Sequence, residues 1–176
     1  MNFDHYKGYF SDNFGAVVTG NKQDILDVPH KWALKQLETH GLLIFRNFKV
    51  DLNTFSKFIG QNSRRVTADP ARKSSVQNAQ LIDAGDVEMG LHIENGNLPF
   101  LPEAQWFYCE KAATKGSQTT ACDGFKVWEK LSDRAKKAFT TKKILYIRNI
   151  PENLWKKYLS TELQVSIETV GAEHLE

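Results

Sequence analysis

Apolar residues recur at helical spacing on either side of a short apolar run near the start of the chain. Residues 27–40 predict a helix, because an acidic residue and a proline precede the apolar positions and a glycine follows them. Residues 51–59 predict a second helix with one apolar face, and the continuous apolar run 42–45 between them predicts a buried strand. We therefore expect a helix–strand–helix unit over 27–60. Residues 1–26 are mixed and rich in turn formers, which indicates an irregular arm over the core. The positions behind these patterns are Asp27, Pro29, Trp32, Leu34, Leu37, Gly41, Leu52, Phe55, Phe58 and Ile59.

The rest of the chain alternates between β-prone runs and capped helices. Aromatic and β-branched residues favour strands, whereas Asp123 and Ser132 stand where helix N-caps are favoured. The stretch between the two regions, 61–75, is polar and basic, and it indicates a solvated loop or a loop that closes over a substrate. The predicted strands are 76–82, 105–109, 118–122, 144–147 and a weaker one at 163–170, and the predicted helices are 124–131, 132–139 and 151–159.

Length and composition indicate one domain with a real core, since the chain has 176 residues of which 41% are hydrophobic. The net charge of +2 comes from well-mixed residues, which argues against a nucleic-acid-binding stripe. No apolar run has the length of a membrane span, and the first residues lack the layout of a signal peptide. Cys109 and Cys122 lie in apolar runs, so we expect reduced, buried thiols of a cytoplasmic protein, although neighbouring strands could bring them together.

His92 and Glu94 are the candidate chemical residues. In an extended segment, residues two apart point to the same face, so this imidazole and this carboxylate would lie side by side. Such a pair can chelate a divalent metal and supplies two of the three ligands in the facial triad of non-haem Fe(II) oxygenases. The alternative is a solvated strand end with no metal.

Four segments resemble motifs of one enzyme family, and they occur in that family's order. The segments are 40–48, 91–95, 106–109 with 116–119 and Asp123, and 146–149 with Trp155. Together they resemble the N-terminal and central part of Fe(II)/2-oxoglutarate-dependent oxygenases of the taurine dioxygenase-like (TauD/TfdA) type. The resemblance spans residues 40–161.

This resemblance implies a fold and a site. The fold would be α+β or mainly β: a partial double-stranded β-helix, or jelly roll, over 76–176 with flanking helices. His92 and Glu94 would bind Fe(II), and Thr119 would hydrogen-bond a carboxylate of the cosubstrate 2-oxoglutarate. With O₂, such a site hydroxylates or desaturates a small molecule, such as an amino acid or a carrier-bound intermediate of secondary metabolism. Most members have Asp where this chain has Glu94, and glutamate supplies the same oxygen ligand.

The chain departs from the family pattern downstream. The family's third ligand is a histidine, and an arginine that binds 2-oxoglutarate follows it. In this chain His174 is the only histidine beyond Glu94, and we expect it to be a surface residue near the end of the sequence. The C-terminal strands of the jelly roll also have no counterpart in this sequence. We therefore expect one subunit of a split enzyme, completed by a second polypeptide or by a homo-oligomer. Two alternatives remain: a catalytically inactive remnant that serves as a binding or scaffolding subunit, and a β-rich binding module with an accidental His–Glu pair.

Overall fold

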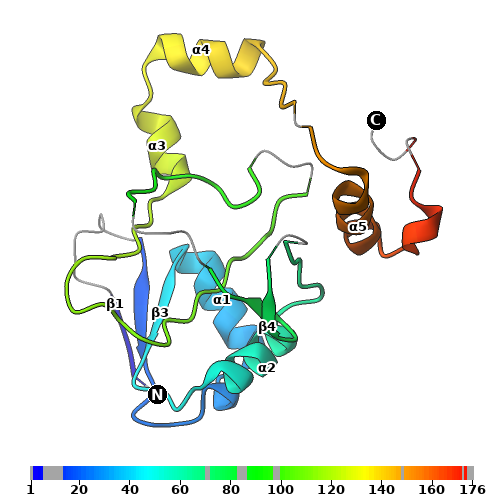
Figure 1. Ribbon diagram of the computed structural model, residues 1–176. Coiled ribbons are helices and arrows are strands. Elements are labelled where there is room, and N and C mark those ends of the chain that lie inside the picture. Colours follow the sequence, from blue (N-terminus) through cyan, green and yellow to red (C-terminus); the bar gives the residue numbers. More distant parts are fainter. Residues whose placement is uncertain are drawn as a thin grey trace.

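The computed structural model of the protein combines small sheets with helices (Figure 1). The structure describes residues 14–69, 72–82, 87–96, 100–147, 149–171 and 173, and the backbone of 2–5. Its strands are β1 (Asn2–His5), β2 (Ala16–Thr19), β3 (Leu43–Arg46), β4 (Ser74–Val76) and β5 (Ala79–Gln80). Its helices are η1 (Ile25–Asp27), α1 (His30–His40), α2 (Leu52–Asn62), α3 (Gly124–Lys130), α4 (Asp133–Thr141), α5 (Glu152–Leu163) and η2 (Ile167–Thr169).

A three-stranded sheet, ordered β1-β2-β3, forms one side of the core. β2 pairs antiparallel with β1 and parallel with β3, in a register that sets Ala16 opposite Leu43 and Val18 opposite Phe45. Ala16 and Val18 are fully buried. The irregular arm expected over 1–26 is therefore wrong in this part, because these residues include the central strand of the sheet.

The helix–strand–helix unit forms as expected, with one shifted boundary. The predicted first helix starts later than expected, because α1 begins after Pro29 rather than after Asp27. A separate short helix, η1, precedes it and is capped by Asp24. Gly41 ends α1 in the left-handed conformation, with a φ of 70°. Asp51 caps α2 by accepting a hydrogen bond from the backbone N–H of Thr54 at 2.7 Å.

A buried cluster joins α1 and α2 to the sheet and to η1. Phe58 on α2 meets the ring of Phe45 at a centroid distance of 5.8 Å, and the ring of Trp106 at 5.5 Å. Both contacts are edge-to-face, an arrangement that aromatic pairs prefer. The cluster consists of Ile25, Val28, Ala33 and Phe58, with Leu26, Trp32, Phe45, Phe48, Val50 and Trp106 packed against it.

The strand expected at 76–82 is a hairpin instead. β4 and β5 pair antiparallel on either side of Gln77 and Asn78. The Asn78 backbone N–H donates to Ser56 Oγ at 3.0 Å, and its side-chain amide donates to the Ser56 carbonyl at 2.9 Å. These two bonds attach the hairpin to α2.

None of the remaining predicted strands joins a sheet among the described residues. Residues 100–108 belong to no helix or strand, but their alternate side chains are half-buried, and the Tyr108 hydroxyl donates to the Val50 carbonyl at 3.1 Å. Residues 118–122 and 144–147 also belong to no helix or strand, and nearly all of their side chains are exposed. Residues 163–170 contain the end of α5 and η2 rather than a strand. The described residues therefore show a mixed helix-and-strand fold without a closed jelly roll.

The helices of the second half form as their sequence signals indicate. Asp123 caps α3 and Ser132 caps α4, and α5 runs four residues beyond its predicted end. Both cysteines are free and exposed, so the buried environment expected for Cys109 and Cys122 is wrong. No helix in the described part of the chain is long and apolar enough to cross a membrane.

Candidate metal centre

A turn positions the two candidate ligands. The backbone N–H of Gly96 donates to the carbonyl of Ile93 at 3.0 Å, which closes a four-residue turn with Glu94 at its second position. Asn95 occupies the third position with a φ of 55°, a conformation that asparagine tolerates better than most residues. His92 precedes this turn in extended backbone.

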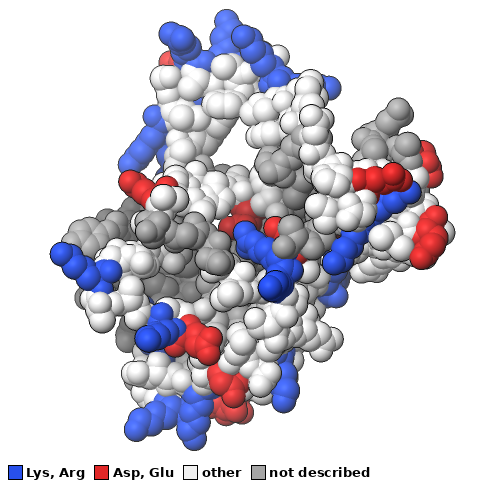
Figure 2. Space-filling model, viewed as in Figure 1, with Lys and Arg blue, Asp and Glu red and all other residues white. Residues whose placement is uncertain are grey.

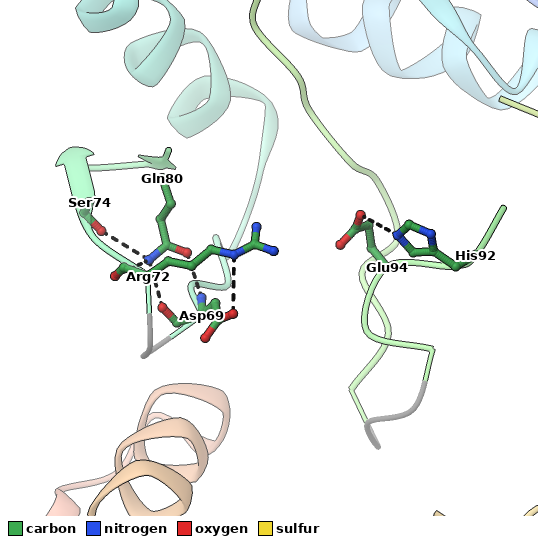
Figure 3. Close-up of polar contacts among 6 residues, drawn as sticks. All are labelled: Asp69, Arg72, Ser74, Gln80, His92 and Glu94. Atoms are coloured by element: carbon green, nitrogen blue, oxygen red, sulfur yellow. Dashed lines mark hydrogen bonds and ion pairs between the residues drawn. The ribbon is translucent and has the colours of Figure 1, made fainter. Parts of the chain in front are cut away.

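The side chains of His92 and Glu94 face each other, as Figure 3 shows. His92 Nε2 lies 3.4 Å from Glu94 Oε1. The other ring nitrogen, Nδ1, lies 2.9 Å from the carbonyl oxygen of Gly90. Both side chains are partly open to solvent, with exposed fractions of 49% and 37%. The two side chains therefore lie side by side as expected, but the extended segment from which this was predicted is wrong at Glu94, which lies in the turn.

The hydrogen bond to Gly90 determines which ring nitrogen is free. A carbonyl oxygen only accepts, so in the neutral imidazole Nδ1 carries the hydrogen and Nε2 presents its lone pair toward Glu94. In this tautomer a proton or a metal ion can bridge the Nε2 lone pair and the carboxylate oxygen. The Gly90 carbonyl raises the pKa of His92 above its ordinary value, and Glu94 contributes to the same shift.

Thr119 is not brought to this pair by any contact within the described residues. It is exposed in an extended segment that follows Gly116 and Ser117, whose φ angles are 74° and 56°. Its role toward 2-oxoglutarate stays a prediction. Among the described residues, no three His, Cys, Asp or Glu side chains form a group that could hold a metal ion. His174 lies outside the described residues.

Gln80 organises the polar loop that precedes the metal segment, a role the sequence did not reveal. The Asp69 N–H donates to Gln80 Oε1 at 2.8 Å, and Gln80 Nε2 donates to the carbonyls of Asp69 and Arg72 at 2.9 and 3.2 Å (Figure 3). Arg72 Nε also lies 3.5 Å from Asp69 Oδ2. This part of the loop is therefore braced by one amide, and its closure over a substrate stays a hypothesis. The carbonyl of Gly90 was likewise missed, because a backbone acceptor leaves no mark in a sequence.

Comparison with known proteins connects this geometry to one family. Residues 6–172 match the model of the Taurine catabolism dioxygenase TauD, TfdA family. No curated protein and no solved structure matches the chain. The family match covers the metal segment, both candidate ligands and nearly all of the described helices and strands. The chain belongs to the TauD/TfdA dioxygenase family.

Proposed function

We propose that this protein is a subunit of an Fe(II)/2-oxoglutarate-dependent oxygenase that hydroxylates or desaturates a small molecule. Membership of the family supports this class of activity in general. The observation that carries the proposal for this chain is the facing pair of His92 Nε2 and Glu94 Oε1. We expect a substrate such as an amino acid or a carrier-bound intermediate.

The donor pair suits a divalent metal in its chemistry and its spacing. Imidazole nitrogen and carboxylate oxygen are two of the ligand types in the facial triad for Fe(II). Metal bonds of about 2.1 Å place two ligands at right angles about 3 Å apart. The observed 3.4 Å lies close to that separation, so a small shift of either side chain would admit the ion.

Each candidate site residue would have a separate role. Fe(II), with 2-oxoglutarate and O₂, supplies the oxidising chemistry when it is bound. His92 and Glu94 would hold the ion, and the Gly90 carbonyl would keep Nε2 of His92 free to bind by retaining the hydrogen on Nδ1. Thr119 would hydrogen-bond a carboxylate of 2-oxoglutarate.

The accessible surface supports completion of the fold by further polypeptide. The chain exposes 14204 Å², whereas a compact monomer of its mass, 20.1 kDa, is expected to expose roughly 8,700 Å². The excess is larger than most obligate interfaces bury. In our proposal a second polypeptide, or another copy of this chain, covers this surface and supplies the third iron ligand and the arginine for 2-oxoglutarate.

An anaerobic titration tests the proposal. Fe(II) and 2-oxoglutarate are added to the chain alone and to the chain co-expressed with the product of a neighbouring reading frame. A weak visible charge-transfer band that His92→Ala abolishes and His30→Ala retains is the supporting result. His30 is the matched control because it lies at the start of α1, outside the metal segment.

Two other outcomes have definite meanings. A colourless but folded protein in both preparations would overturn the oxygenase and favour an inactive binding subunit. A band of full strength in a monodisperse preparation of the chain alone would overturn the shared site and leave the oxygenase.

A further inference from the structure

Basic residues are concentrated in the segment 124–147, here called the basic arm. It consists of α3, α4 and the extended residues after α4, and it carries seven lysines and arginines against two acidic residues. Its net charge is therefore +5, so the rest of the chain carries −3 of the total of +2. Figure 1 shows α3 and α4 projecting from the body, and Figure 2 shows basic side chains gathered over α4 at the top.

Large apolar side chains are exposed among these charges. Phe125 is 85% exposed, Phe139 56%, Leu145 80% and Ile147 80%. Single exposed apolar residues are ordinary, but a series of them along one arm marks an interaction surface. Charge alone does not explain such residues, because they gain free energy only when another apolar surface covers them.

The backbone after α4 is also open. Residues 144–147 belong to no helix or strand, and within the described residues their N–H and C=O groups make no backbone–backbone hydrogen bond. An unpaired backbone segment with strand-forming side chains is a template for an added strand. Lys142 and Lys143 lie immediately before it, so cations flank the open strand at one end.

We propose that the basic arm docks an acidic, apolar segment of a partner polypeptide, which pairs as a strand with residues 144–147. Its carboxylates would lie near Lys142, Lys143 and the lysines of α4, and its apolar side chains would cover Leu145 and Ile147. This inference rests on the proposed completion by a second polypeptide, and it gives the chemistry of that partner.

Other anionic partners satisfy only part of this surface. A nucleic acid would pair with the lysines but would leave the exposed Leu145 and Ile147 without an apolar cover. An anionic membrane would accept lysines and apolar side chains, but lipid cannot satisfy the open backbone of 144–147. A polypeptide strand satisfies all three features.

A binding experiment on the full chain tests the inference. The probe is a fluorescein-labelled peptide of alternating glutamate and valine, and its anisotropy is followed at 50 and 500 mM NaCl. We expect binding that salt weakens, and that Lys142→Glu with Lys143→Glu weakens by about tenfold or more. Lys31→Glu with Lys49→Glu is the matched control, because it makes the same charge change away from the arm and should leave binding nearly unchanged.

A second variant tests strand pairing. Tyr146→Pro removes one N–H from the open segment at an exposed position, so it should weaken the peptide without altering the circular dichroism. The inference is overturned if a lysine–valine peptide binds equally well, or if duplex DNA or phosphatidylglycerol vesicles bind more tightly. It is also overturned if the control pair loses as much binding, or if the chain self-associates through the arm. The iron band is measured separately, so a parent chain that fails to bind the glutamate–valine peptide but shows the band rejects the inference and leaves the oxygenase.

Discussion

A backbone carbonyl prepares His92 for its proposed role. Gly90 accepts from Nδ1 at 2.9 Å, and this bond selects the tautomer in which Nε2 faces Glu94. Outer partners of this kind fix the orientation of metal-binding histidines and raise their basicity. The spacing of His92 and Glu94 alone indicated that they share a side, but the anchor that orients the ring became visible only in the structure.

Two substitutions of Glu94 should show whether Fe(II) binding depends on the carboxylate itself or on the length of the side chain that carries it. Glu94→Asp keeps the charge and should weaken Fe(II) binding only modestly, because the turn at 93–96 gives the shorter side chain nearly the same direction. Glu94→Ala removes the oxygen ligand and should weaken binding by at least about tenfold. Anaerobic calorimetric titration with Fe(II) measures both, and equal affinities for the two variants would contradict metal binding by Glu94.

The cap of α2 gives a pH-dependent prediction at one residue. Hydrogen bonds from Thr54 hold the pKa of the Asp51 carboxyl below its ordinary value. The folded form therefore binds this proton less readily than the unfolded form, so the contribution to stability is complete above the unfolded pKa and disappears as the pH falls through the folded pKa. Asp51→Asn should show a smaller loss of urea stability than the parent between pH 4 and pH 2. Asp27→Asn, in η1, is the control, and an identical acid response of the Asp51→Asn and parent proteins would refute the prediction.

At the scale of elements, helices could be predicted where the decisive signals are local. Asp123 and Ser132 cap the helices that their positions indicated, because a cap acts within three residues. Strands depend on partners far along the chain, which a pattern of apolar residues does not identify. Residues 144–147 have the composition of a strand, but no ladder forms there among the described residues. Conversely, β2 is central because β3 pairs with it in parallel, which the mixed composition of 1–26 did not suggest.

The packing of α2 on the sheet should dominate the stability of the first half. Phe58 is 2% exposed and contacts both Phe45 and Trp106, so Phe58→Ala leaves a cavity in the core and should lower the free energy of unfolding by about 3–5 kcal/mol. Phe125→Ala makes the same chemical change at a side chain that is 85% exposed, and it should change stability by less than about 0.5 kcal/mol. Urea denaturation followed by circular dichroism compares them, and similar losses would show that α2 does not form the core.

Arg65 holds α5 against the loop after α2. Its Nη1 donates to the Glu162 carbonyl at 2.5 Å, and its Nη2 lies 2.9 Å from Glu162 Oε2. The carboxylate is 1% exposed, and neither of its oxygens accepts an aligned hydrogen bond in the described part of the chain. Burial raises the pKa of the neighbouring Tyr158 hydroxyl, and Glu162 adds to this shift.

Removal of Arg65 should therefore release α5. Arg65→Met leaves a buried carboxylate without its cation, but Arg65 is 40% exposed, so the loss should be below the ~3–5 kcal/mol of a fully buried pair. Hydrogen exchange should become faster in α5 and stay unchanged in α2. Adding Glu162→Leu should recover much of the loss. Faster exchange across the whole chain would indicate that the pair supports global folding instead.

At the scale of the whole molecule, the candidate site is open because one half of the chain has little to pack against. The core lies among the sheet, α1 and α2, whereas almost every side chain from 109 to 147 is exposed or only partly covered. The motifs in that half resemble a family fold in which strands pair across a roll, so their local structure depends on pairing partners elsewhere. Thr119 shows this: its place in the motif indicates a role toward 2-oxoglutarate, but that role requires neighbours that no contact within the described residues supplies.

The excess surface leads to a prediction about size in solution. A compact protein of 176 residues has an expected radius of gyration of about 16 Å. Because this chain exposes 14204 Å² and projects α3 and α4 from its body, small-angle scattering of the chain alone should give a clearly larger value (Figure 1). The isolated chain should also enhance the fluorescence of a dye that binds apolar surfaces, while circular dichroism shows intact helices. A complementing polypeptide should quench that fluorescence, because it covers the residues to which the dye binds. A radius near 16 Å without dye binding would mean that the chain covers its own apolar face, and completion by a partner would then be unnecessary.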